Sequence, residues 1–216
     1  MKKILSVVAI LVMGSLSLTA QKKSDIRING YAGYTFDDKI DSYYDPTSYY
    51  RGTIRGGFQG GIGIESKLNR ATGIELLYLN QATTAPMEYY KSGIQYKTYE
   101  VGLNYYLLSF NRYFGMNPKV EPYFSPMLGL AFANIKNPNI GGASGYTKFA
   151  WGLRAGANIW ASSKVGIKLQ MQLLSVSQGF GGGAYFGTGG AGFALSSYSS
   201  IYQFGLGGGL TFKLGK

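Results

Sequence analysis

Few side chains of this sequence could carry out catalytic chemistry, because two residue types that enzymes use often are missing. The 216 residues include no histidine and no cysteine. Without histidine, the commonest general base, Ser-His-Asp and Asp-His arrangements are impossible. Without cysteine there is no disulfide framework and no thiolate metal site. We therefore expect no enzymatic activity, no catalytic or metal-binding residues and no cofactor.

A cluster of aspartates in the segment 37–53 is the first feature that resembles a ligand site. Its members are Asp37, Asp38, Asp41 and Asp45. Clustered carboxylates bind calcium in some proteins, but this spacing fits no EF-hand pattern. A solvated acidic loop explains the cluster better than a metal site does.

The glycine-rich segment 175–200 holds the second such feature. Gly187-x-Gly189-x-x-Gly192 matches the letters of a dinucleotide-binding fingerprint. That fingerprint requires a strand before it, a helix after it and a later acidic residue, and no acidic residue follows Glu121. The segment is better explained as a low-complexity loop. Together with the aspartate-rich segment, it is where we expect a surface partner or a partner in a complex to bind.

The sequence is basic, with a formal net charge of +11. A basic chain suggests nucleic-acid binding, but these cations are scattered and form no run longer than Lys22-Lys23. Scattered basic residues also suit anionic lipid headgroups. Membrane lipid is therefore an expected partner, and nucleic acid is not.

Residues 1–20 have the three parts of a secretory signal peptide. A pair of lysines is followed by the apolar run 4–13 and then by small residues that end at Ala20. The apolar run is too short for a membrane-spanning helix. We expect cleavage after Ala20, so that 21–216 forms the mature domain.

The rest of the sequence alternates between apolar and polar residues, which is the pattern of β-strands with two different faces. Pro122 and Pro126 interrupt one of these stretches on its apolar face, which allows a bulge there. Eight segments show the alternation: 26–36, 54–68, 73–81, 96–108, 120–133, 149–160, 165–174 and 201–214.

The connections between these segments alternate in length. Short turns at one end and long loops at the other are typical of outer-membrane barrels, in which the short turns lie in the periplasm. The pattern therefore predicts an all-β fold, an eight-stranded antiparallel up-and-down transmembrane β-barrel. The long connections are 37–53, 82–95, 134–148 and 175–200, the short ones are 69–72 and 161–164, and 109–119 is intermediate.

The polar faces of the segments favour a membrane barrel over a soluble β-sandwich. They hold glycine, glutamine, asparagine and tyrosine with charges of both signs, whereas a solvated face would be rich in lysine, glutamate and threonine. This composition suits a narrow barrel interior that side chains fill. The predicted interior charge network consists of Arg27, Arg55, Glu65, Glu75, Glu100, Glu121, Arg154, Lys168 and Lys213.

The apolar faces carry hardly any charge, which fits lipid, where Arg or Lys at the bilayer midplane costs about 2–4 kcal/mol. Closure of the sheet is required because an open edge would leave unsatisfied backbone groups in hydrocarbon. Aromatic residues near the strand ends of this face are predicted to lie at the lipid interface. They are Tyr34, Phe36, Tyr99, Tyr105, Trp151 and Phe212.

Glycines recur at inward positions of the first, second and last segments. We expect large residues of the opposite wall to fill the space that these glycines leave, so that no continuous pore remains. The predicted filling residues are Tyr106, Tyr123, Met127 and Trp160.

Several short stretches carry a resemblance to a known group of proteins. They are Gln21 as the first mature residue and the stretches 73–78, 121–123, 152–156 and 200–205, with Gly207, Leu210 and Phe212 as part of an insertion signal. Through them the chain resembles the small outer-membrane β-barrel proteins of Bacteroidota (outer membrane protein beta-barrel domain, or porin-like, families). Its architecture is similar to that of the OmpA transmembrane domain and OmpX. The resemblance implies a barrel fold in the outer membrane and no single activity.

We therefore expect a monomeric integral outer-membrane barrel with a structural or surface-interaction role and a lumen filled by polar side chains. Two alternatives share this fold: a narrow porin-like channel for small solutes, and a barrel subunit of an outer-membrane secretion or assembly complex. A soluble exported sandwich or lipocalin-like binder is the alternative with a different location.

Overall fold

The computed structural model describes most of the chain: residues 25–45, 48–90, 93–115, 119–136, 143–177, 184–187, 190–193 and 201–214. The predicted signal peptide and its cleavage point lie outside the described residues, as do several parts of the glycine-rich segment 175–200. Within the described ranges, no helix has the length and apolar character needed to cross a membrane.

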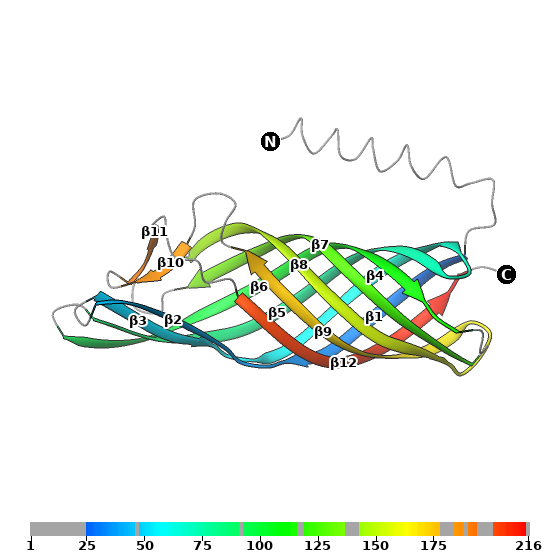
Figure 1. Ribbon diagram of the computed structural model, residues 1–216, viewed down its shortest axis with the longest axis horizontal. Coiled ribbons are helices and arrows are strands. Elements are labelled where there is room, and N and C mark those ends of the chain that lie inside the picture. The colour runs from blue at the N-terminus through cyan, green and yellow to red at the C-terminus, as the bar shows by residue number, and fades with distance from the viewer. Residues whose placement is uncertain are drawn as a thin grey trace, which may run out of the picture.

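Eight antiparallel strands close into a barrel (Figure 1). They are β1 (Asp25–Thr35), β4 (Gly57–Asn69), β5 (Thr72–Tyr90), β6 (Ile94–Tyr113), β7 (Val120–Lys136), β8 (Ala143–Trp160), β9 (Val165–Ser177) and β12 (Ile201–Lys213). The barrel closes because β1 pairs with β4 on one side and with β12 on the other. The fold predicted from alternation is confirmed.

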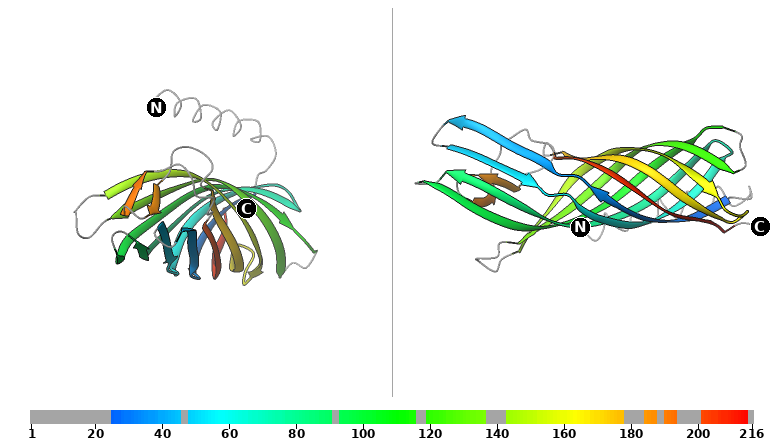
Figure 2. Two further views of the ribbon diagram at one scale, coloured as in Figure 1. Left: turned by 60° about the vertical axis from the view of Figure 1, so that its left-hand side comes forward. Right: turned by 90° about the horizontal axis from the view of Figure 1, so that it is seen from below.

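The connections give the barrel two different ends. The turn end carries the connections 70–71, 114–119 and 161–164. The other end, here called the loop end, carries two hairpins: β2 (Asp38–Asp45) with β3 (Ser48–Ile54), and β10 (Ala184–Gly187) with β11 (Gly190–Phe193). β2 and β3 extend beyond the barrel wall at this end (Figure 2).

Two of the predicted loops are largely strand. The segment 37–53 forms the β2–β3 hairpin, and β3 pairs with β5 from Tyr50↔Tyr89 to Gly52↔Met87. β5 and β6 stay paired as far as Tyr90↔Ile94, so most of the predicted connection 82–95 is strand. Alternation weakens in both segments, but tyrosine and threonine there still favour extended structure.

The register shows that the strands are strongly tilted. Arg27 lies near the start of β1. Tracing its pairing partner from strand to strand around the barrel ends at Gln203 of β12, which lies beside the opposite end of β1. Such a stagger accompanies the tilt of a small closed barrel. Side chains that are distant in the sequence therefore meet at one level of the interior.

The prolines of β7 do not produce a bulge. The ladder with β8 runs without a register shift through Pro122↔Ala157 and Pro126↔Leu153. Proline lacks the backbone N–H, and the pairing with β6 is interrupted only between Ser109↔Met127 and Arg112↔Phe124. Both proline side chains face outward. The bulge that the sequence allows is therefore not formed in this ladder.

The outer and inner surfaces of the wall differ in chemistry. Apolar side chains are exposed on the outside of each of the eight strands, for example Ile64, Leu128, Leu169 and Leu206. Inside, charged side chains occupy the turn-end part, whereas an apolar cluster that includes Leu79, Tyr99 and Leu103 occupies the loop-end part. The sequence predicts a lumen filled by polar side chains throughout. In the structure polar side chains fill the turn-end part, and apolar side chains fill much of the loop-end part.

Strand β6 has the opposite sidedness from the one predicted. Tyr99 and Tyr105 are buried inside the barrel and are not interfacial aromatics, while Glu100 is exposed on the outside and does not belong to the interior charges. The reason lies at the turn end of the same unbroken strand, where Ser109 and Asn111 face the polar interior. Since alternate residues share a face, Tyr99 and Tyr105 must then also point inward.

The sidedness of β6 is testable with single-cysteine variants, because the chain has no cysteine of its own. Tyr105 is 0 % exposed and Tyr106 is 55 % exposed. We expect a nitroxide at Tyr106→Cys to be mobile and accessible to oxygen dissolved in lipid. A nitroxide at Tyr105→Cys should be immobile and shielded from both oxygen and aqueous nickel reagents. The reverse pattern in electron paramagnetic resonance would restore the sidedness predicted from sequence.

Candidate functional site in the barrel interior

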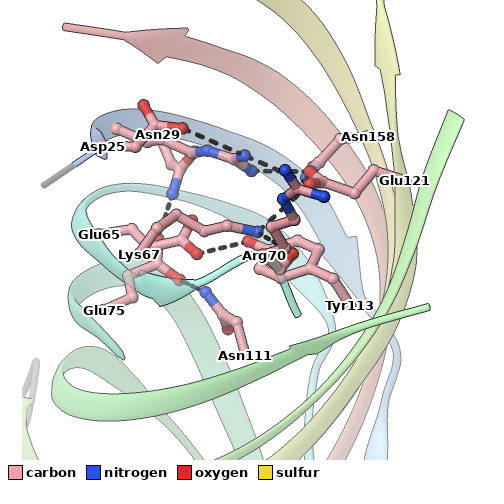
Figure 3. A network of polar contacts seen from close by, with 11 residues as sticks. Asp25, Asn29, Glu65, Lys67, Arg70, Glu75, Asn111, Tyr113, Glu121 and Asn158 are labelled. Carbon is pink, nitrogen blue, oxygen red and sulfur yellow. Dashed lines mark hydrogen bonds and ion pairs between the residues drawn. The ribbon is translucent and has the colours of Figure 1, made fainter. Parts of the chain in front are cut away.

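A carboxylate at the turn end of the interior is held by groups from three other strands. Arg27 donates to both oxygens of Glu121, from Nη1 to Oε2 at 2.7 Å and from Nη2 to Oε1 at 3.3 Å. Lys67 donates from Nζ to Oε1 at 3.3 Å, and the amide of Asn158 donates to Oε2 at 3.0 Å. These contacts join β1, β4, β7 and β8 (Figure 3).

A second carboxylate lies deeper, where water scarcely reaches. Glu75 accepts a hydrogen bond from the hydroxyl of Tyr31 at 2.5 Å and one from the amide of Asn29 at 2.7 Å, both at Oε1. Asn111 donates to Oε2 at 3.4 Å, and Nη1 of Arg154 lies 3.8 Å from the same oxygen. Both charged side chains of this ion pair are only 1 % exposed. Charge-assisted hydrogen bonds of this kind are stronger than neutral ones.

Aromatic rings neighbour most of the interior cations. The guanidinium of Arg154 lies 4.6 Å from the ring centre of Tyr31, and Nζ of Lys168 lies 4.8 Å from that of Tyr123. Nζ of Lys67 is 3.5 Å from the ring centre of Tyr113. Ring faces attract cations most strongly where water is excluded. The tyrosine rings therefore stabilise the interior cations in addition to the carboxylates.

Six of the predicted network residues lie together inside the barrel: Arg27, Glu65, Glu75, Glu121, Arg154 and Lys168. Lys213 stands apart at the turn end, where its Nζ lies 3.7 Å from the ring centre of Trp160. Glu100 lies outside the wall, as the sidedness of β6 requires.

Arg55 also lies outside the interior network, contrary to the prediction. It occupies the two-residue break between β3 and β4, where its backbone N–H donates to Thr84 O at 2.9 Å and its side chain is exposed. Ile54 is buried before the break and Gln59 is buried after it. Before the break the even-numbered residues face inward, and after it the odd-numbered residues do. The single continuous strand 54–68 predicted from sequence therefore assigns Arg55 to the wrong face.

Sequence reasoning missed three partners of the network. Lys67 shares the inward face of β4 with Glu65, and this parity could have identified it. Tyr31 and Tyr113 are inward tyrosines whose hydroxyls donate to Glu75 and to Glu65, the latter at 2.6 Å. Alternation places each tyrosine on a face but does not name its partner, because the partner depends on the register between distant strands.

Tyr123 and Met127 lie beside glycines of the adjacent strand β8 and not, as predicted, across the barrel from the glycines of the first, second and last segments. At those glycines the space is occupied by neighbouring strands, for example by Leu79 beside Gly61. A Cβ atom built on Gly156 would lie 2.9 Å from the hydroxyl of Tyr123, and one on Gly152 would lie 3.0 Å from Cε of Met127. Tyr106 is not among the filling residues because it is exposed on the outside. The cavity beside Gly33 and Gln59 has a volume of only about 10 Å³, which is about the space of one water molecule.

The outward aromatic positions are only partly those predicted. Tyr34, Phe36 and Phe212 are exposed on the outer surface, and Phe36 stacks with Phe204 at 5.9 Å between ring centres. Trp151 is half-buried beside Tyr202. With Tyr99 and Tyr105 inside, the sequence prediction is wrong for those two residues.

The interior arrangement is suited to holding strands together. Arg27 and Lys67 pair with Glu121, Arg154 pairs with Glu75, and Lys168 and Glu65 contact tyrosines. The described part of the chain holds no cluster of three or more acidic side chains suited to a metal ion. Each carboxylate links strands that are far apart in the sequence. The expected chemical result is a rigid, cross-linked polar layer.

Comparison with known proteins supports the fold and no closer relationship. No protein-family model matches the sequence, and no curated protein matches it. Neisserial surface protein A matches with a TM-score of 0.57 and 14 % identity, covering 88 % of this chain and 97 % of that one. The outer membrane protein OprG of Pseudomonas aeruginosa matches with a TM-score of 0.56 and 12 % identity, covering 90 % and 98 %. The fold and wall chemistry define the class: a small β-barrel of the outer-membrane type.

Replacing Glu75 tests the importance of the deeper cluster. Glu75→Gln preserves the shape of the side chain but leaves Arg154 without its carboxylate. Because removal of one partner of a buried pair typically costs about 3–5 kcal/mol, we expect a loss of this size in the free energy of unfolding. Urea unfolding in lipid vesicles measures it.

The matched control is Glu100→Gln, the same substitution on the outer surface, which should leave stability unchanged. Equal stabilities of the two variants would show that the Glu75 cluster does not stabilise the barrel.

Proposed function

We propose that the protein is an integral outer-membrane β-barrel with a structural or surface-interaction role. The observation that carries the proposal is the sidedness of the wall, with apolar side chains such as Ile64 and Leu128 exposed outside and Glu75 and Arg154 buried inside. Exposed apolar surface is unfavourable in water at roughly 25 cal/mol per Å², whereas acyl chains accommodate it. The turn end then faces the periplasm and the loop end faces outward, as in barrels of this kind.

The packing of the interior favours a closed lumen and not a porin-like channel. A channel for small solutes needs a continuous hydrated path, but Glu75 and Arg154 in the turn-end part and Leu79 and Leu103 in the loop-end part are almost inaccessible to water. Solutes would have to displace both layers. We therefore favour the closed barrel over the porin-like alternative.

The loop end is the surface that we assign to partners. The β2–β3 hairpin extends the wall beyond the barrel, and β10 and β11 belong to the segment 175–200. We infer that 37–53 and 175–200 make any contacts with a surface partner, or with other subunits if the barrel belongs to a complex. The barrel itself needs no second subunit to close, which supports a monomer.

Export and the absence of catalysis complete the proposal on sequence grounds. The signal-like residues 1–20 would direct the chain to the secretory pathway. A hydrolytic role is not part of the proposal, because the chain has no histidine to act as general base.

Planar-bilayer recordings test the closed lumen. The purified barrel should insert, as shown by a heat-dependent change in gel mobility, and should give no conductance steps above the leak of the bilayer. The charged layer and the apolar layer would both block ion flow. Discrete, reproducible conductance steps from the inserted protein would contradict the closed lumen and support the porin-like alternative.

A further inference from the structure

The apolar outer surface is interrupted on one side of the barrel. On β5 and β6, Tyr78 and Tyr106 face outward with their ring centres 5.1 Å apart. The next outward positions toward the loop end are polar or small: Asn80 and Ala82 on β5, and Asn104 and Gly102 on β6. On β4, β8 and β12, exposed aromatic residues such as Phe58, Phe149 and Phe204 continue toward that end.

The polar residues at this interruption bind one another. Nδ2 of Asn80 donates to Oδ1 of Asn104 at 2.9 Å, and the hydroxyl of Tyr78 donates to the same oxygen at 2.8 Å. These two bonds involve only one amide atom of Asn104. Asn80 and Asn104 therefore expose polar amide atoms on the outer surface. On neighbouring strands, exposed aromatic residues occupy the same level of the wall. Polar groups facing lipid are costly, and residues retained there despite the cost point to a function.

A groove begins beside this pair and continues toward the loop end. It has a volume of about 530 Å³ and is lined by residues of β5, β6 and β7, including the outward residues Thr84, Gly102, Asn134 and Lys136. Its floor is open because Gly102 lacks a side chain: a Cβ built there would meet only Asn134, at 4.0 Å. Binding pockets for small molecules have volumes of about 300–1,000 Å³.

The chemistry of the groove indicates a sugar that carries a phosphate. Thr84 and Asn134 offer uncharged donors and acceptors of the kind that bind hydroxyl groups. Lys136 supplies a cation at the rim, opposite Glu100 in the pairing of β6 with β7. Glu100 is the acidic lining residue and can accept hydrogen bonds from sugar hydroxyls. Apolar contacts for acyl chains continue directly below, at Tyr106 and Phe132, whose rings lie 5.5 Å apart.

We propose that this groove binds the phosphorylated sugar headgroup of a glycolipid in the outer leaflet, with the acyl chains of that lipid lying on the wall below. The inference rests on the proposed membrane location, because only there do a headgroup and its chains meet the wall in this order. The polar interruption of β5 and β6 is then a specific lipid site, and the sidedness of β6 follows from two requirements at once: Asn111 inside at the turn end and Asn104 outside at the loop end.

The experiment uses the purified full barrel in a tetraethylene glycol detergent, which has no sugar to compete. Diphosphorylated lipid A is titrated against it and followed by native mass spectrometry, with phosphatidylglycerol as the anionic lipid without a sugar. We expect one lipid A molecule to bind in preference to phosphatidylglycerol. Gly102→Leu should fill the groove and weaken lipid A binding about tenfold, a loss of about 1.4 kcal/mol in binding free energy.

The matched control is Gly30→Leu, an outward glycine of β1 where an added Cβ meets nothing within 4 Å. This variant should bind lipid A as the unmodified protein does. Lys136→Met should weaken binding of the diphosphorylated form more than of a dephosphorylated one, whereas Lys164→Met at the turn end should affect neither.

Heat-dependent gel mobility is measured first and separates the two proposals. A chain that fails to insert into detergent micelles overturns the proposed membrane function. An inserted barrel that binds both lipids equally, or that binds lipid A undiminished in Gly102→Leu, overturns only the groove. A dimer that Gly102→Leu abolishes would also overturn it, by assigning this face to a second copy of the chain.

Discussion

A carboxylate cannot face hydrocarbon, and this constraint determines how the wall of the barrel is arranged. Glu75, Glu65 and Glu121 lie on strands whose opposite faces are exposed and apolar, so each strand can present only one of its faces to lipid. Once inside, each carboxylate needs partners, because an unpaired buried charge is costly. The partners come from β1, β4, β6 and β8, and the charge constraint on single strands therefore also fixes how distant strands are placed around the barrel.

Strand β6 shows what happens when two parts of one strand place opposite demands on its faces. Its loop-end half has a regular apolar face, with Val101 and Leu103, that could lie against lipid. Its turn-end half has Asn111, whose amide donates to Glu75. An unbroken strand cannot satisfy both, and the buried polar group prevails because its exposure to lipid would leave Glu75 with one donor fewer. The apolar half then forms the core of the loop-end lumen, and Glu100 faces outward.

The strand segments and six of the interior charges could be predicted from alternation, and the closed eight-stranded fold from alternation together with the lengths of the connections. Two kinds of feature could not. The first is a change of parity within a segment, as at Arg55, where a short break between two strands is invisible to a pattern of period two. The second is the identity of partners, such as Tyr113 with Glu65, which depends on the stagger of strands across the barrel. The sequence also predicts β5 and β6 to be shorter than they are, because their pairing continues beyond the residues that alternate.

The sidedness of the wall is tested most directly by nuclear Overhauser contacts between lipid and side-chain methyl groups. The protein is methyl-labelled at leucine and isoleucine and embedded in lipid nanodiscs. The account predicts cross-peaks from acyl methylenes to Ile64, Leu128 and Leu169, and none to Leu79, Leu103 or Leu174. Acyl contacts to the second set, or water contacts to the first, would contradict it.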